Sequence, residues 1–142
     1  MLFPEKFKNK KILIFGYGKT GKSVQKYFIK NKVSYTIWDD NRKLNIKKID
    51  KKYYLKKYDY IILSPGVDIY HHQNKGFFKK HKKNIITDLD IFFLTEKKLR
   101  YIIGVTGTNG KSSFCNLLNN LIKKNNIKSR VLGNFGNPVL DE

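Results

Sequence analysis

The sequence lacks the residues that would cross-link the chain or anchor it in a membrane. A single cysteine, Cys115, excludes an internal disulfide and any metal site built from several cysteines. No apolar run approaches the roughly 20 residues that a membrane-spanning helix needs. The N-terminus also lacks the long apolar core of a signal peptide. We therefore expect a cytoplasmic protein that does not insert into a membrane.

Acidic residues and arginine are also scarce. Lys and Arg together number 30 against 11 Asp and Glu, which gives a net charge of +19. Only Arg42, Arg100 and Arg130 are arginines. Such a charge indicates either a polyanionic partner or a drift in composition toward lysine on solvated faces. The lysines are scattered and arginine, the preferred base-reading residue, is rare. We therefore expect no nucleic-acid partner, although the field would still attract a phosphorylated ligand.

Histidine provides no obvious metal site. His71, His72 and His81 lie in a polar segment without partner ligands at metal-binding spacing. We expect all three to be surface residues.

The stretch GVTGTNGKSS, residues 104–113, carries the strongest chemical signal. It follows an apolar run at 101–103 and precedes a helical pattern whose apolar face runs from Phe114 to Ile122. A strand, a Gly-rich turn, Lys-Ser and a helix are the parts of a phosphate-binding loop. Lys111 is the predicted catalytic residue, because it would reach the β- and γ-phosphates of ATP, and the Ser112 hydroxyl would bind Mg²⁺. The predicted phosphate-binding residues are Gly107, Thr108, Asn109, Gly110, Lys111, Ser112 and Ser113.

The loop departs from the common spacing at Val105, where most phosphate loops have their first glycine. It is therefore a variant, which makes an ordinary GTPase or helicase a poor match. A Gly-rich turn with a chance Lys-Ser is the alternative interpretation.

A second nucleotide-type loop lies near the N-terminus. The apolar run 11–15 leads into GYGKTG, residues 16–21, which has the form GxGxxG and precedes a predicted helix. A second predicted strand, 33–38, ends at Asp39, 18 positions after Gly21. An acid about 20 residues on is typical of a ribose-binding residue in a dinucleotide-binding unit. Asp39 could instead be a turn residue, and this motif alone would favour NAD.

Further strands are predicted at 59–63 and 84–87, and a short helix at 88–94 with Asp88 as its N-cap. The charged break at 96–98 separates two expected units. Residues 1–96 would form a Rossmann-like α/β domain with a parallel sheet. Residues 97–142, with strands at 100–105 and 129–132, would be the truncated start of a P-loop ATPase α/β domain, because about 45 residues cannot supply a covered parallel sheet.

The two loops, together with SPGV at 64–67 and GNFG at 133–136, resemble the Mur ligase family of bacterial cell-wall synthesis. The phosphate loop alone would also admit folylpolyglutamate synthases, but the Rossmann-like first domain with SPG favours the Mur ligases. Within that family the closest resemblance is to the branch that joins D-glutamate to UDP-N-acetylmuramoyl-L-alanine. The chain would be the N-terminal portion of such an enzyme and inactive alone.

The resemblance implies an ATP- and Mg²⁺-dependent acid–amino-acid ligase that works as a cytoplasmic monomer. ATP would convert the substrate carboxylate to an acyl phosphate, which the D-glutamate amine attacks. The resemblance also reassigns the first loop from NAD to the UDP part of the substrate. The implied UDP-substrate residues are Gly18, Lys19, Thr20, Asp39, Gly66 and Asn134. An NAD-binding Rossmann protein and a basic nucleic-acid-binding module are the rival hypotheses.

Overall fold

The computed structural model describes residues 6–40, 57–95, 101–133 and 138–141. Its centre is a parallel sheet of the strands β1 (Ile12–Phe15), β2 (Thr36–Trp38), β3 (Tyr60–Leu63) and β4 (Ile85–Ile86). The order is β2-β1-β3-β4, and every neighbouring pair is parallel. The α/β class and the four strands predicted in the first unit are thereby confirmed, although each strand is shorter than its apolar run.

The strands end together. Phe15 pairs with Trp38 on one side and with Leu63 on the other. The residues that follow these three strands therefore meet at one edge of the sheet, where parallel α/β proteins bind ligands.

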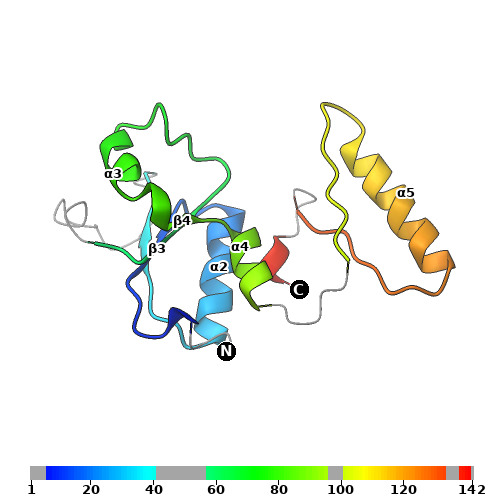
Figure 1. Cartoon of the computed structure of the whole chain (residues 1–142), viewed down its shortest axis with the longest axis horizontal. Coiled ribbons are helices and arrows are strands. Elements are labelled where there is room, and N and C mark those ends of the chain that lie inside the picture. The colour runs from blue at the N-terminus through cyan, green and yellow to red at the C-terminus, as the bar shows by residue number, and fades with distance from the viewer. Residues whose placement is uncertain (1–5, 41–56, 96–100, 134–137, 142) are drawn as a thin grey trace.

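Helices cover both faces of this sheet (Figure 1). A long helix, α2, packs beside β1, and α4 and the turn η3 lie next to it. The helical elements are α2 (Lys19–Lys30), α3 (Lys75–Lys80), η2 (Lys82–Asn84), α4 (Asp88–Thr95), α5 (Lys111–Lys124) and η3 (Val139–Asp141).

Alternation along the strands divides the core in two. Ile12, Ile14 and Ile62 point to the face covered by α2, where they pack with Val24 and Phe28. The opposite face carries a second cluster, made of Leu13, Phe15, Tyr58, Ile61, Phe77 and Phe78. A sheet buried on both faces explains why the strands read as continuous apolar runs.

The segment η3 contributes to the first of these cores. Leu140 belongs to the cluster beneath α2, and η3 packs against α2 and α4. Asp141 lies 4.0 Å from the ammonium of Lys26 on α2. Residues from beyond the charged break at 96–98 therefore pack on the first sheet.

Helix α4 begins differently from the prediction. Asp88 is its first residue, and the cap is Thr87. The Thr87 N–H donates to Asp90 Oδ2 at 2.7 Å, and the Asp90 N–H donates to Thr87 Oγ1 at 3.3 Å. This reciprocal pair is a capping box, which satisfies two helix-end groups at once and therefore displaces Asp88 from the cap position.

No strand forms at 101–105, the described part of the strand predicted at 100–105, or at 129–132. Tyr101, Ile102 and Ile103 are instead exposed. A strand needs a neighbour for its backbone hydrogen bonds, and no described strand pairs with either segment. Helix α5 forms as predicted, but none of its residues is buried, and it stands apart from the sheet in Figure 1.

Two of the three histidines contradict the surface prediction. His81 is 4% exposed, and its Nδ1 donates to the carbonyl of Phe77 at 3.0 Å. His72 is largely enclosed by Phe15 and Phe78. Only His71 is freely exposed. Each of the other two rings has an aromatic neighbour from a distant segment, Phe15 for His72 and Tyr58 for His81. A local reading of the sequence could not reveal these contacts.

Across the described residues, no helix has the length and apolar character to cross a membrane. The same residues contain no cluster of three or more His, Cys, Asp or Glu that could hold a metal ion.

Candidate functional site

The turn that follows β1 is built into the sheet edge. The Gly16 N–H donates to the carbonyl of Trp38 at 2.8 Å, and the Ser64 hydroxyl donates to the Gly16 carbonyl at 2.8 Å. Gly16 has φ +93°, and a Cβ there would lie 2.7 Å from the Ser64 Cβ. Only glycine suits this position, so the start of the turn is fixed by the ends of β2 and β3.

The other two glycines of GYGKTG play different roles. A Cβ on Gly21 would lie 2.1 Å from the Gly16 carbonyl oxygen, so Gly21 lets α2 approach the turn. Gly18 has no described atom within 4 Å of its would-be Cβ. Packing therefore explains the first and third glycines, whereas the middle one leaves its backbone open to an approaching group, the arrangement of a dinucleotide-type loop.

Helix α2 presents a positive N-terminus beside this open backbone. Gly18 is its N-cap and supplies no side-chain cap, so the first helical N–H groups, at residues 19–21, have no intrahelical partner. The first turn contains no acid but carries Lys19 and Lys22. Cations at this end oppose the helix dipole. The arrangement is favourable when an anion binds there.

Asp39 reaches this loop from the end of β2. Its Oδ2 accepts the Tyr17 N–H at 2.5 Å. The carboxylate is therefore fixed against the loop across 22 positions of sequence, which a simple turn residue would not require. Gly66 lies after β3 and is exposed, with no described atom near its would-be Cβ. The structure thus brings Gly18, Lys19, Thr20, Asp39 and Gly66 to one sheet edge, while Asn134 lies outside the described residues.

Asp40 was not predicted as a site residue, and it also joins distant segments. Its Oδ1 accepts the Trp38 indole N–H at 3.1 Å, and its Oδ2 accepts from His72 Nε2 at 2.6 Å. Gln73 Nε2 lies 3.5 Å from Oδ1. Consecutive acids directly after a predicted strand were the only sequence signal of this role.

The loop that follows β3 contains an exposed hydrogen bond between two of its own side chains. His71 Nδ1 lies 2.7 Å from Asp68 Oδ2. This side-chain hydrogen bond, with smaller contributions from the N–H groups of Tyr70 and His71, lowers the pKa of Asp68.

In α4, burial raises the pKa of Asp88 above the usual range of an aspartate.

The second predicted loop has the backbone of a phosphate loop but few contacts. Gly107 and Gly110 have φ +153° and +74°, and Gly110 is the N-cap of α5. The Lys111 ammonium folds back onto the carbonyls of Gly107 and Thr108, the latter at 3.1 Å. All seven predicted phosphate-binding residues, 107–113, are exposed.

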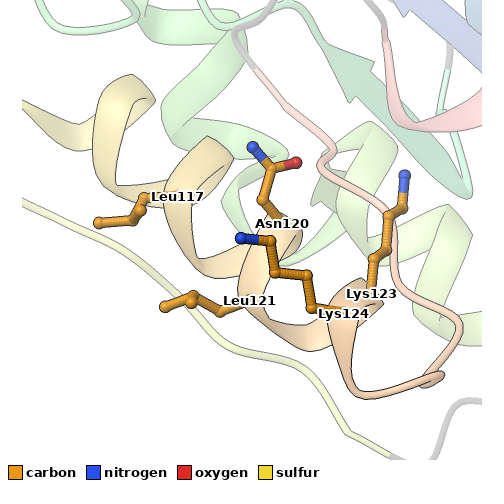
Figure 2. A pocket seen from close by; sticks show the side chains of 5 residues that line it. All are labelled: Leu117, Asn120, Leu121, Lys123 and Lys124. Atoms are coloured by element: carbon orange, nitrogen blue, oxygen red, sulfur yellow. The ribbon is translucent and has the colours of Figure 1, made fainter.

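Helix α5 also borders an open hollow of about 490 Å³. Leu117, Asn120, Leu121, Lys123 and Lys124 line it (Figure 2). These residues belong to the later turns of the helix, away from Lys111 and Ser112 at its start. The hollow therefore includes none of the predicted site residues.

Comparison with known proteins agrees with this geometry. The family model "Mur ligase MurD-like, N-terminal domain" matches residues 10–86, which contain all four strands and the glycine turn. The chain belongs to the Mur ligase family. The predicted site residues that meet at the sheet edge, from Gly18 to Gly66, all lie inside the matched range.

Curated relatives extend the likeness along the chain. A UDP-N-acetylmuramoylalanine–D-glutamate ligase of Wolbachia from Brugia malayi is 36% identical over 96% of this chain and 30% of its own length. Ligases of the same name from Rickettsia prowazekii (37% identical, 94% of this chain, 32% of their own) and Francisella philomiragia (33%, 99% and 34%) also match. The present Mur ligase chain thus spans about a third of the length of these relatives.

Proposed function

We propose that this chain is the N-terminal part of an ATP-dependent ligase that adds D-glutamate to UDP-N-acetylmuramoyl-L-alanine in peptidoglycan synthesis. Residues 1–96 are the UDP-substrate domain, and residues 97–142 open the ATP-binding domain. The observation that carries the proposal is the open backbone at Gly18, which lies beside a positive helix end in a loop that the Tyr17 N–H ties to Asp39. The full-length relatives, named as ligases of this kind, support the choice of substrate.

In this proposal the substrate diphosphate lies at the start of α2. The N–H groups of residues 19–21 donate to phosphate oxygens, and Lys19 and Thr20 add a charge and a hydroxyl. Asp39 accepts a hydrogen bond from the uracil end, and Gly66 contacts the nucleotide through its backbone. Asn134 completes the set from the second unit.

Lys111 and Ser112 serve the ATP half of the reaction. The conformation of the loop fits the phosphates of ATP. Gly107 and Gly110 have the positive φ that a backbone wrapped around phosphate uses, and Lys111 already lies over the loop carbonyls. Ser112 would hold Mg²⁺, which when bound offsets charge on the phosphates. Lys111 would exchange its carbonyl contacts for phosphate oxygens and stabilise the charge that develops during transfer.

The chemistry has two steps. The terminal carboxylate of the substrate attacks the γ-phosphorus of ATP, so that ADP leaves and an acyl phosphate forms. The amine of D-glutamate then attacks the acyl carbon, and inorganic phosphate leaves with formation of the amide. The residues present here bind and orient the reactants. We propose that the 142-residue chain alone binds the UDP-substrate weakly and does not ligate, and that the enzyme acts as a monomer in the cytoplasm.

Titration of the chain with three ligands tests the proposal. UDP-N-acetylmuramoyl-L-alanine should bind, and NADH should not compete with it. Binding of duplex DNA with a steep salt dependence, and little response to UDP, would favour a basic nucleic-acid-binding module instead. Preference for NADH would favour a dinucleotide-binding Rossmann protein instead. Substrate-dependent ADP release near an ordinary enzymatic rate, roughly 1–10³ s⁻¹, would contradict the expected inactivity of the chain alone.

A further inference from the structure

The end of β2 carries two consecutive acids that face different loops. Asp39 holds the glycine turn through the Tyr17 N–H at 2.5 Å. Asp40 holds the segment that follows β3 through His72, with Nε2 and Oδ2 2.6 Å apart. The strand end therefore ties together both loops of the proposed UDP site, and His72 is the contact on the second side.

Both ring nitrogens of His72 have partners. Its Nδ1 accepts the N–H of Asn74 at 3.0 Å, and a carboxylate oxygen of Asp40 can only accept from Nε2. These two bonds fix the tautomer, with the hydrogen on Nε2. His72 is thus a bridge with one donating and one accepting end.

Aromatic packing holds the imidazole in this orientation. Its ring meets Phe15 edge-on at 5.4 Å between centroids and Phe78 at 5.3 Å, while its side chain is 13% exposed. Phe15 and Phe78 also contact each other at 4.8 Å. Phe15 is the last residue of β1, directly before Gly16. His72 therefore contacts the end of β1 through Phe15 and the end of β2 through Asp40.

The segment that carries Gly66 is therefore fixed at both ends. Ser64 ties its start to the Gly16 carbonyl at 2.8 Å, and His72 ties its far end to Asp40 at 2.6 Å. We propose that His72, acting through Asp40, is a positioning residue for nucleotide binding. It sets the position of the Gly66 backbone and of the adjacent Asp39 carboxylate. This inference rests on the proposed function, because it assumes that UDP binds at this edge.

The chain contains its own reporter of this bridge. Trp38 is the only tryptophan, and its indole N–H donates to the second oxygen of Asp40 at 3.1 Å. Its ring also stacks on Phe15 at 6.3 Å. The indole N–H resonance and the fluorescence of the chain should therefore respond when His72 releases Asp40, with or without ligand.

Two variants of His72 separate its two hydrogen bonds. His72→Gln keeps a donor near the Nε2 position, and His72→Asn keeps an acceptor near Nδ1 but cannot reach Asp40. Exposed His71 offers a matched control as His71→Asn, since among the described residues its ring bonds to Asp68 alone. UDP and UDP-N-acetylmuramoyl-L-alanine are titrated into the 142-residue chain and its variants, with the indole N–H resonance recorded before and after.

We expect His72→Asn to weaken UDP binding roughly 3- to 10-fold, the size of one net hydrogen bond, and to shift the ligand-free indole resonance. His72→Gln should restore most of both properties, and His71→Asn should change neither. Equal UDP affinity in His72→Asn and the unchanged chain would overturn the inference while leaving the proposed function intact. An unmoved indole resonance in ligand-free His72→Asn would also overturn it. Absence of UDP binding to the unchanged chain would contradict the proposed function, and with it this inference.

Discussion

The two glycine-rich loops of this chain differ in what holds them. In the first loop, Gly16 is in close contact with Ser64, and Gly21 is in close contact with Gly16. The loop is also hydrogen-bonded to the ends of β2 and β3. In the second loop, Gly104 and Gly110 have no described atom within 4 Å of a would-be Cβ. Helix α5 behind it has no buried residue. The first loop is thus set by tertiary packing, whereas the second is set by its own backbone and by Lys111.

This difference indicates how much each motif relies on its surroundings. Catalytic and binding groups must be held on rigid elements to act with precision. The first loop has that support within the described residues, so its open middle glycine is a pre-formed feature. The second loop shows the residue types of a phosphate site, and its apolar helix face, including Phe114 and Leu117, is uncovered. Such a face is a surface for further packing or for aggregation.

Loss of the second loop's lysine should have the largest effect on activity. In a full-length Mur ligase that begins with this sequence, Lys111→Ala should reduce amide formation at least about 100-fold, as for other charge-stabilising groups. Binding of the UDP-substrate should be nearly unchanged, because the first loop is built independently. Lys123→Ala, on a later turn of α5, is the control. Normal turnover in Lys111→Ala would exclude this residue as the phosphate lysine.

Packing of the first loop should dominate stability. Gly21→Ala places a Cβ 2.1 Å from a backbone oxygen, which should lower the free energy of unfolding by about 3 kcal/mol, the upper range for overpacking. Gly104→Ala meets no described atom and should stay within about 0.5 kcal/mol. Urea denaturation of the two variants measures the contrast. Equal losses would mean that the loops are not differently supported.

The carboxylate at the end of β2 should matter for ligand affinity. Asp39→Ala removes one charge-assisted hydrogen bond to the proposed uracil end and should weaken UDP-substrate binding by on the order of 1.5–3 kcal/mol. Asp39→Asn keeps an acceptor for the Tyr17 N–H and separates loop stability from ligand contact. Calorimetric titration of both variants is the measurement, and unchanged affinity in both would remove Asp39 from the site.

The smallest expected effect is that of pH on stability, and it should be confined to the unit that contains the sheet. Burial raises the folded-state pKa of Asp88 above its unfolded value near 3.8. Its contribution therefore favours folding below pH 3.8 and is lost as pH rises through the folded pKa. Relative to the unchanged chain, Asp88→Asn should become more stable across that window and then level off. Residues 101–133 contain no Asp or Glu, so the helicity of α5 should not follow this titration.

Sequence predicted the features that depend on local pattern. The apolar runs located all four strands, and those of β1 and β3 end at glycine-containing turns. The GxGxxG spacing located the start of α2. Features that depend on long-range contact were missed. The bond between Asp40 and His72 joins residues 32 positions apart, and η3 reaches back to α2. The strand expected at 100–105 failed for the same reason, since pairing partners cannot be read from an apolar run.

Prediction of the site residues had the same limit, because it too used only local patterns. Gly18, Asp39 and Gly66 each follow a predicted strand, and they lie at one sheet edge because parallel strands end together. Their roles toward UDP stay predictions. The supporting residues Ser64 and His72 act through contacts to the backbone and to Asp40, and no spacing rule identifies such partners.

Gly18 provides the most direct test of the central claim that the first loop is a pre-formed nucleotide site. Its backbone is extended, with φ −74° and ψ −159°, which suits valine, and no described atom lies within 4 Å of a would-be Cβ. Calorimetric titration of UDP-N-acetylmuramoyl-L-alanine into the chain and into Gly18→Val, with thermal unfolding of both, is the measurement. We predict that the free energy of unfolding of Gly18→Val lies within about 1 kcal/mol of that of the unchanged chain. We also predict that Gly18→Val shows no detectable binding of the ligand. Equal binding by Gly18→Val would contradict the account, because the ligand would then not approach the loop where the structure leaves it open.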